Sequence, residues 1–253
     1  MFVARLSKAL MLKRIVESTK DIINEINLEC LESEISFRAM DGAHVALVSV
    51  SLDRKQFERF ECVRPTVVGL NLVSLNKIIT RVHDDSSLTL RIEEDLMDFL
   101  NIEFTSSGQK RSYDLRLISI DHEKISIPEQ DFGTVISISS LEFKRICQDL
   151  NVVGESLNVK SQQGTDVVVF SSVGDFENKC TIELEAQDDL TISVGSDIDM
   201  SFSLKYILVF IKASIFSERV KIYLKAEMPM LVEYKLDDSY IKFYLAPKFM
   251  EDE

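Results

Sequence analysis

The sequence has few cysteines and no cysteine motif. Four of its 253 residues are cysteines, namely Cys30, Cys62, Cys147 and Cys180, and no two of them form a CxxC pair. Zinc knuckles and disulfide frameworks need closely or regularly spaced cysteines, so neither is expected. We predict reduced and buried thiols instead.

Long hydrophobic runs are also missing. No apolar stretch approaches the roughly 18–20 residues that span a bilayer. The first residues, MFVARLSKALMLKRIVESTK, are amphipathic rather than signal-like. With only eight Gly and four Pro, the chain has little room for disorder outside residues 249–253. We therefore expect a soluble intracellular protein without a membrane partner.

The common catalytic and nucleotide-binding motifs do not occur. GxxxxGK[ST], GxGxxG, HExxH and GxSxG are absent, and His44, His83 and His122 share no metal-binding spacing. Carboxylates are plentiful, so a catalytic pair of acids stays open, but no spacing singles one out. The sequence predicts a protein that is not an enzyme and that carries no cofactor or metal.

The sequence contains the same order of predicted helices and strands twice. Helical apolar spacing predicts helices at residues 6–26, 72–82, 140–150 and 204–213, the first capped by Ser7. The strings LKRIV at 12–16 and FKRIC at 143–147 stand at matching places in the two halves. The expected strands cover residues 26–31, 35–40, 44–52, 67–70, 87–92, 99–105, 112–117, 135–138, 156–160, 166–171, 178–184, 189–194, 220–226, 230–236 and 241–245. The predicted fold class is α+β, with two similar domains that each place two helices on one face of a sheet.

The two domains are expected at residues 1–117 and 134–253, with a connecting loop at 118–133. The segment Leu115 to Phe132 starts as an alternating strand, becomes charged, and regains apolar residues before Pro128. Pro128 cannot donate a backbone hydrogen bond, and it biases Ile127 toward extended geometry. A surface tether and an edge strand that ends in a turn fit this segment equally well.

The charge distribution is unusual for an acidic chain. The net charge is −13 and the pI is about 4.8, which taken alone argues against a nucleic-acid partner. Each expected helix nevertheless carries cations opposite its apolar stripe. Such a basic face suits phosphates without sequence preference, although Lys and Arg also commonly solvate the outside of any single helix. The cations are Lys13, Arg14, Lys20, Lys77, Arg81, Lys144, Arg145, Lys205 and Lys212.

Five stretches of the sequence resemble one known family. They are FVARLSKALMLKRIVESTKDIINE at the N-terminus, MDGAHVALV at 40–48, ECVRPTVVGLNLVSLNKII at 61–79, IPEQDF at 127–132 and YLAPKF at 244–249. Together they resemble the proliferating cell nuclear antigen family of eukaryotic sliding DNA clamps, along the whole chain and in the same order.

The resemblance implies a fold, partners and a location. Three chains would close a homotrimeric ring of six DNA-clamp domains, with the helices and their cations facing a central channel around double-stranded DNA. The ring would act in the nucleus as a processivity factor for replicative DNA polymerase. It would also be a docking platform that binds DNA polymerase, clamp loader and DNA repair proteins through short peptide motifs.

The resemblance also implies two sets of binding residues. Without it, we would assign Met40, Val45, Leu47 and Tyr244 to the core and interpret His44 as a satisfied histidine. The implied subunit interface contains Tyr113, Leu115, Phe176, Cys180 and Ile182. The implied partner pocket contains Met40, His44, Val45, Leu47, Ile125, Ile127, Pro128, Pro229, Tyr244, Ala246 and Pro247.

The sequence departs from the family at two positions. The family's main lysine acceptor for ubiquitin or SUMO aligns with Gln163, with Lys160 the nearest lysine, and Gln148 replaces a channel-facing cation. Two other functions remain as alternatives: a subunit of a heterotrimeric checkpoint-type clamp, and a protein-interaction scaffold that works away from DNA.

Overall fold

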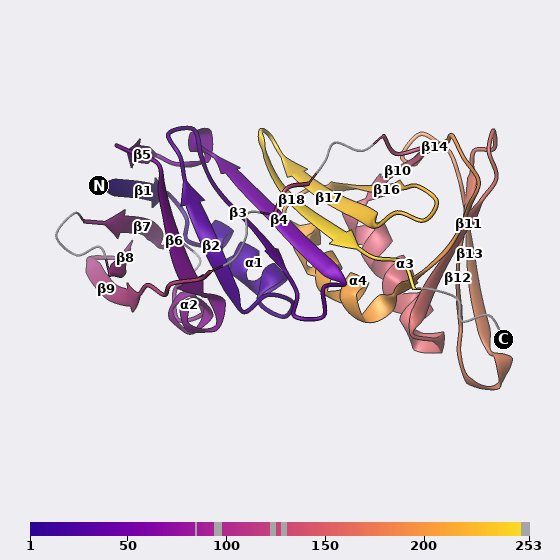
Figure 1. Cartoon of the computed structure of the whole chain (residues 1–253), viewed down its shortest axis with the longest axis horizontal. Helices are drawn as coiled ribbons and strands as arrows, with labels where there is room; N and C mark the ends of the chain where they lie inside the picture. Colours follow the sequence, from indigo (N-terminus) through magenta and orange to yellow (C-terminus); the bar gives the residue numbers. More distant parts are fainter. Residues whose placement is uncertain (84, 94–97, 122–124, 128–130, 249–253) are drawn as a thin grey trace. The chain divides into compact units, whose positions relative to one another are not determined.

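The computed structural model describes residues 1–83, 85–93, 98–121, 125–127 and 131–248. The chain divides into two compact units (Figure 1). The first unit contains Met1–Met40, Val48–Ser126 and Asp237–Tyr240. The second contains Asp41–Leu47, Ile127–Leu236 and Ile241–Glu253. Each unit therefore includes a short segment that lies far from the rest of it in the sequence.

The first half of the chain alternates strands with two α-helices. Its elements are β1 (Phe2–Leu6), α1 (Leu10–Thr19), β2 (Glu25–Cys30), β3 (Glu34–Met40), β4 (Ala46–Asp53), β5 (Arg59–Cys62), β6 (Thr66–Asn71), α2 (Leu72–Ile79), β7 (Ser87–Ile92), β8 (Phe99–Ser106) and β9 (Gln109–Arg116). A 3₁₀ turn, η1 (Arg54–Gln56), follows β4.

The second half repeats this order. Its elements are β10 (Thr134–Ser139), α3 (Ser140–Val153), β11 (Ser156–Ser161), β12 (Val167–Val173), β13 (Lys179–Glu185), β14 (Thr191–Val194), β15 (Ile198–Ser203), α4 (Leu204–Phe210), β16 (Arg219–Leu224), β17 (Met230–Leu236) and β18 (Ser239–Leu245). Two 3₁₀ turns are η3 (Asp175–Glu177), before β13, and η4 (Ile211–Ile215), after α4.

The strand orders of the two halves are the same. In the first half the strands are ordered β5-β1-β7-β8-β9 and β4-β3-β2-β6, and in the second β14-β10-β16-β17-β18 and β13-β12-β11-β15. Adding nine to each strand number of the first half gives the second half. Neighbouring strands pair antiparallel, as in β1 with β7 and β10 with β16. The predicted α+β fold with two topologically similar domains is therefore confirmed.

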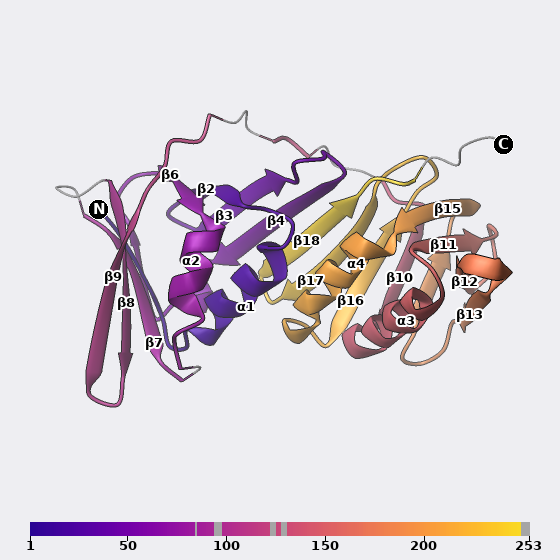
Figure 2. The ribbon, with the colours of Figure 1, turned by 90° about the horizontal axis from the view of Figure 1, so that it is seen from below.

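The helices cover their sheets with apolar faces. In the first half α1 packs against α2, and in the second α3 packs against α4 and η4 (Figure 2). Phe143 of α3 meets Phe170 of β12 with ring centroids 6.5 Å apart, and Phe210 of α4 stacks on Phe243 of β18 at 4.6 Å. Each buried side chain of this size stabilises the fold by roughly 1.5–3 kcal/mol relative to exposure.

The first helix is shorter than its apolar spacing predicts. It begins at Leu10 and ends at Thr19 instead of covering residues 6–26, and Ser7 does not cap it, because Ala9 occupies the N-cap position. The Ser18 and Thr19 hydroxyls both donate to the Ile15 carbonyl at 2.9 Å, and such bonds compete with helix continuation. Residues 25–30 then pair with β6, so the apolar residues after the helix belong to a strand.

The other helices also differ at their ends. α2 ends at Ile79 and not at residue 82, so Arg81 lies just beyond it. α4 ends at Phe210, and Lys212 lies in η4. α3 instead continues three residues past its expected end, to Val153. The expected apolar stripes are nevertheless the buried faces, as Leu72, Leu75 and Ile79 show for α2.

Candidate DNA-facing, partner-binding and edge-strand sites

The helix cations of the first unit lie on or just after α1 and α2. On α1, Lys13 and Arg14 are half-buried, while Ile15 and Val16 point into the core. Lys20, at the C-cap of α1, forms a 2.7 Å ion pair with Asp21. Lys77 and Arg81 are both exposed. Because α1 packs against α2, the five cations belong to one helix pair.

The helix cations of the second unit have the same placement. On α3, Lys144 is half-buried and Arg145 is exposed, and Arg145 lies 3.5 Å from Glu142 one turn away. Lys205 and Lys212 are exposed at the start of α4 and in η4. Each helix pair therefore presents Lys and Arg opposite its buried stripe, an arrangement that can bind phosphates but reads no base sequence.

The loop Asp41–Leu47 is built around one carboxylate in the second unit. The backbone N–H groups of Val45 and Ala46 both donate to Asp41 Oδ1 at 2.8 Å, and that of Ala43 donates to Oδ2 at 3.3 Å. The Tyr206 hydroxyl, from α4, donates to Asp41 Oδ2 at 2.7 Å. The loop is thus folded around Asp41 and fastened to a helix 165 residues later in the chain.

The electrostatics of Asp41 follow from these bonds. Burial alone would raise the pKa of Asp41, but the hydrogen bonds from Ala46, Tyr206, Val45 and Ala43 together bring it below its usual value. The hydrogen bond that the Tyr206 hydroxyl donates to Asp41, together with burial, raises the pKa of Tyr206. Asp41 is therefore a carboxylate and Tyr206 a neutral phenol at neutral pH. Nothing in the sequence pointed to Tyr206.

Three expected pocket residues of the second unit lie on this loop, and four more lie in β18, just after it or just before β17. His44 is exposed with a φ of 59°, a left-handed conformation that is uncommon for residues other than Gly. The Val45 carbonyl accepts a 2.9 Å bond from the Ala246 N–H, just past the end of β18. Leu47 is buried and begins the core of β4. Pro229, Tyr244, Ala246 and Pro247 are all half-buried.

The remaining expected pocket residues are placed differently. Met40 ends β3 in the first unit and is 39% exposed. Ile125 is also counted with the first unit, where its carbonyl accepts a 3.2 Å bond from Arg38 Nη1 of β3. Ile127 is half-buried and belongs to the second unit, and Pro128 lies outside the described residues.

The segment after β9 is held by scattered bonds rather than by a continued strand. Its start forms an isolated bridge, in which the Ile118 N–H donates to the Gly69 carbonyl at 3.0 Å. A Cβ at Gly69 would lie 2.1 Å from the Ile118 carbonyl oxygen, so only glycine admits this approach. Further along, Asn27 Nδ2 donates to the Ile120 carbonyl at 3.4 Å. These contacts keep the described part of the segment beside β2, β3 and β6.

The expected interface residues lie on two edge strands. β9 pairs only with β8, and β13 only with β12, along strands that are fully described. On β9, Tyr113 is half-buried against Phe104, with ring centroids 6.1 Å apart, and Leu115 is buried. Cys180 and Ile182 of β13 are half-buried. Phe176, just before β13, is 96% exposed and has a φ of 55°.

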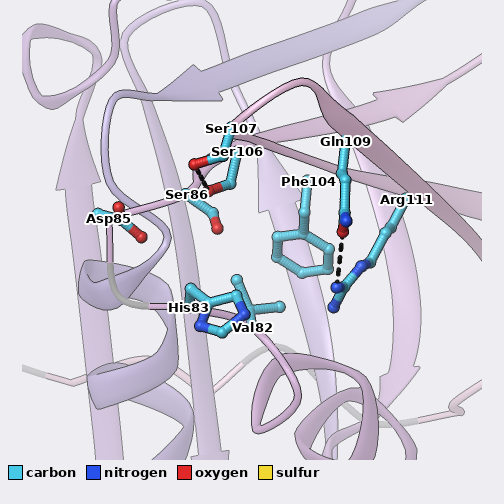
Figure 3. A pocket seen from close by; sticks show the side chains of 9 residues that line it. All are labelled: Val82, His83, Asp85, Ser86, Phe104, Ser106, Ser107, Gln109 and Arg111. Carbon is cyan, nitrogen blue, oxygen red and sulfur yellow. Dashed lines mark hydrogen bonds between the residues drawn. The ribbon is translucent and has the colours of Figure 1, made fainter.

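A cavity of about 270 Å³ opens in the first unit, and no sequence pattern pointed to it (Figure 3). Its lining includes His83 and Asp85, from the turn before β7, and Arg111, from β9, of which Asp85 is acidic and Arg111 basic. Arg111 Nη2 donates to the side-chain amide oxygen of Gln109, Oε1, at 3.0 Å. The lining thus mixes charges of both signs in one place.

Neither a cluster of metal ligands nor a membrane-spanning helix is found in the described parts of the chain. Among residues 1–83, 85–93, 98–121, 125–127 and 131–248, no three His, Cys, Asp or Glu side chains gather closely enough to hold a metal ion. Within the same residues, no helix is long and apolar enough to cross a membrane.

Comparisons with known proteins agree with the duplicated fold. Residues 1–125 match the family model of the proliferating cell nuclear antigen N-terminal domain, and residues 126–249 match that of its C-terminal domain. The proliferating cell nuclear antigen of Chaetomium thermophilum is 40% identical over 262 residues, which cover all of both chains. The Drosophila melanogaster protein named proliferating cell nuclear antigen 2 is 37% identical, covering 98% of each chain. The Caenorhabditis elegans proliferating cell nuclear antigen is 34% identical, covering 100% of this chain and 99% of its own.

Two clamp domains in one chain, each with a basic helix pair, define a sliding DNA clamp. The matches to the two family models and to full-length relatives identify the family within this class. The chain belongs to the proliferating cell nuclear antigen family. Its function is that of a sliding clamp, which is a processivity factor for DNA polymerase and a docking platform for replication and repair proteins.

Proposed function

We propose that three copies of this chain close into a homotrimeric ring of six domains, which encircles double-stranded DNA in the nucleus. The observation that carries this proposal is the placement of cations on both helix pairs of a chain whose net charge is −13. In the ring, the two helix pairs of each copy line the channel, and the acidic residues elsewhere keep the remaining surface from binding DNA.

The helix cations make weak and sequence-independent contacts with phosphates. Lys77, Lys205 and Lys212 are exposed, and long flexible side chains of this kind act as mobile point charges. Each phosphate contact releases counterions, so the affinity of the cations for DNA falls steeply with salt. A closed ring remains on DNA topologically, and weak contacts therefore suffice for sliding.

Ring closure pairs β9 of one copy with β13 of the next. Within the described parts of the chain, each of the two strands is paired along one edge only, and such unpaired edges invite strand addition.

Partner proteins bind at the pocket that the family resemblance implies. Short peptide segments of DNA polymerase, clamp loader and repair proteins insert aliphatic and aromatic anchors beside the loop Asp41–Leu47 and the residues after β18. An exposed His44 and half-buried Val45, Tyr244 and Pro247 offer such anchors a partly apolar surface. The family resemblance adds Ile125 and Ile127 of the connecting segment to the residues that bind these peptides.

The clamp works by holding other proteins on DNA, and we propose that it catalyses no reaction itself. Its interactions with polymerases and repair proteins follow from binding alone, and they need no cofactor. The channel keeps the ring on DNA, and the pocket keeps a polymerase or repair protein on the ring. Both therefore serve one function.

Light scattering across a dilution series tests ring closure directly. We expect a particle of three times the chain mass of 28.9 kDa, stable at low concentration. A monomer at every concentration would contradict the homotrimer and would favour a clamp that needs non-identical chains.

A further inference from the structure

We infer that the outer face of the second unit's sheet binds an acidic stretch of the partner proteins, beside the residues that take their anchors. The outer face is the side of β10, β16, β17 and β18 that points away from α3 and α4 (Figure 2). The inference rests on the proposed partner pocket and adds the charge of the segment next to the anchors. It is carried by three cations, Arg219, Lys221 and Lys235, on a chain whose net charge is −13.

Ring contacts decide which side chains point outward. Phe243 of β18 stacks on Phe210 of α4, so the odd positions of β18 face the helices. Tyr234 of β17 meets Phe243 at 6.4 Å, and Val220 of β16 pairs with Tyr234. The even positions of β16 and β17 therefore face the helices as well. The charged outward residues are Arg219 and Lys221 of β16, Glu233 and Lys235 of β17, and Lys242 of β18.

The strand register brings the three cations close together. Lys221 lies opposite Glu233, and the same register continued by one outward pair places Arg219 opposite Lys235. Cβ atoms of opposite residues are about 4.5–5.5 Å apart, and those of diagonal neighbours about 7–8 Å. Arg219 and Lys235 are like charges directly across two strands, which is destabilising. An anion that binds between them removes this repulsion.

Arg219 is held on the outer face by neutral groups. Its Nε donates to Ser137 Oγ at 3.2 Å, and its Nη2 donates to the Ser137 carbonyl at 2.7 Å. Its Nη1 donates to the Asp189 carbonyl at 3.1 Å. A guanidinium has five N–H donors, so these three bonds leave two. The group is therefore restrained in position while its charge and two of its donors remain for a carboxylate.

The face keeps a positive charge in the folded unit. Among the outward residues of β10, β16, β17 and β18, which are all described, Glu233 is the single carboxylate. Its Oε1 lies 3.2 Å from Lys242 Nζ, and its Oε2 accepts a 2.8 Å bond from the Tyr223 hydroxyl. Arg219, Lys221 and Lys235 form no ion pair with any residue that the structure describes, and all three are exposed.

An acidic peptide fits this face better than a nucleic acid does. Sites for single strands combine cations with aromatic rings on which bases stack. The Tyr223 ring instead packs against Phe132, with centroids 5.4 Å apart, and its hydroxyl is held by Glu233. In an extended peptide, side chains on one side recur about every 7 Å, which is also the step from Arg219 to Lys221. Alternate carboxylates of such a peptide match the cations.

The cations share their sheet with residues of the proposed pocket. Tyr244 is an outward residue of β18, two positions from Lys242, and Pro229 directly precedes β17. A partner whose anchors bind there holds its neighbouring residues at a high local concentration beside the cations. Weak charge contacts then add to affinity, although an acidic segment alone would bind poorly.

Fluorescence anisotropy with matched peptides tests the inference. The first peptide carries only aliphatic and aromatic anchors. Two others add four glutamates before or after the anchors, and two controls add four glutamines in the same places. At about 50 mM salt, the better glutamate peptide should bind the natural chain about three- to tenfold more tightly than its glutamine control. The gain should vanish near 0.5 M salt, because exposed charges are screened.

Variants locate the gain on the outer face. Lys221→Gln and Lys235→Gln should each reduce the gain about two- to threefold, and the double variant should abolish it. Lys225→Gln is the matched control, because Lys225 is an exposed lysine in the turn after β16, and it should keep the full gain. All these variants should bind the anchor peptide as the natural chain does. A gain that persists in the double variant overturns the inference.

The remaining outcomes separate the inference from the pocket. If the natural chain binds the anchor peptide but gains nothing from glutamates, the inference is overturned and the pocket stands. If it does not bind the anchor peptide, both are overturned. A labelled thymidine oligonucleotide tests the other occupant. Oligonucleotide binding that is lost in Lys221→Gln/Lys235→Gln, without a gain from glutamates, would assign the face to nucleic acid instead.

Discussion

Replacing Tyr206 with phenylalanine removes one hydroxyl from the group that fastens the loop Asp41–Leu47. The hydroxyl donates to Asp41 Oδ2 at 2.7 Å. The same carboxylate accepts three backbone N–H groups of the loop. In the variant these backbone bonds remain and the loop can keep its turn. What is lost is the attachment of the loop to α4.

The expected loss of stability is modest. A hydrogen bond to a charged group contributes about 1.5–3 kcal/mol. Tyr206 is half-buried, so water can partly replace its hydroxyl, and we expect about 1–2 kcal/mol. For a chain of this length, each kcal/mol lowers Tm by roughly 2–4 °C. Assembly into the proposed trimer would make Tm depend on concentration, so the proteins are compared at one concentration.

The effect on peptide binding distinguishes a pocket function from general stabilisation. A loop that is no longer fastened must be ordered again when a peptide binds, and this cost reduces affinity. At about 1.4 kcal/mol per tenfold change, we expect a three- to tenfold weaker peptide complex. The assay is fluorescence anisotropy with a labelled peptide that carries aliphatic and aromatic anchors.

Tyr223→Phe is the matched control for Tyr206→Phe. The Tyr223 hydroxyl also donates to a carboxylate, Glu233 Oε2, at 2.8 Å in the same unit, and Tyr223 is likewise half-buried. This variant should lose comparable stability without releasing the loop. If the two variants bound the peptide equally well, the proposed link between Tyr206 and the pocket would be refuted.

The pH dependence of this contribution has a definite sign. The folded-state pKa of Asp41 lies below its unfolded value of about 3.9. Its stabilisation is therefore present above that pH and is lost as pH falls through the folded pKa. The pKa of Tyr206 is raised above about 10, so its contribution is present below that pH and is lost as pH rises through the folded value. The stability difference between the natural chain and Tyr206→Phe should thus stay constant from about pH 5 to pH 9.

Two further predictions concern the channel and the connecting segment. Reversing charge at Lys77, Lys205 and Lys212 should lower clamp-dependent polymerase stimulation several-fold at physiological salt while the trimer mass stays unchanged, because exposed cations contribute to DNA contact and little to folding. Unaltered stimulation would contradict their place in the channel. Changing Ile125 and Ile127 to Asp should weaken peptide binding by about tenfold or more with a small change in Tm, since a buried charge at an apolar contact is costly. Normal peptide affinity in an assay by anisotropy would exclude these residues from the pocket.

The helices and their buried faces could be predicted from the sequence, but the residues at which the helices begin and end could not. Apolar spacing identified the buried faces of the four helices, because burial of a stripe leaves a period of 3.6 in the sequence. It placed Leu6 in a helix, whereas Leu6 ends β1 and pairs with Leu88. The strands β1, β5 and β15 were missed altogether. Their assignment depends on pairing with strands distant in sequence, as in Phe2 with Cys62, and local pattern does not report such pairing.

The candidate sites also contain some residues that the sequence identifies and others that only the structure identifies. Cations opposite an apolar stripe are visible in a sequence, so the helix residues could be named in advance. The fastening of Asp41 by Tyr206 joins positions 165 residues apart, and neither residue type is unusual in its local setting. Asp41 precedes Gly42 and looks like an ordinary turn residue. Only the folded chain shows that this carboxylate organises the loop.

The two halves of the chain share one topology but differ in the burial of their equivalent edge strands. β4 and β13 occupy equivalent positions, yet nearly every residue of β4 is buried, whereas β13 has one buried residue, Leu184, and otherwise alternates between exposed and half-buried residues. An apolar strand such as β4 suits a permanent contact within one chain, because separating it would expose its apolar side chains to water. β9 and β13 instead keep lysine, arginine and glutamate on their outward faces. Exposed charges on a strand add little stability to a contact. In the proposed ring, the two edges that meet between copies are therefore the ones whose separation is least costly.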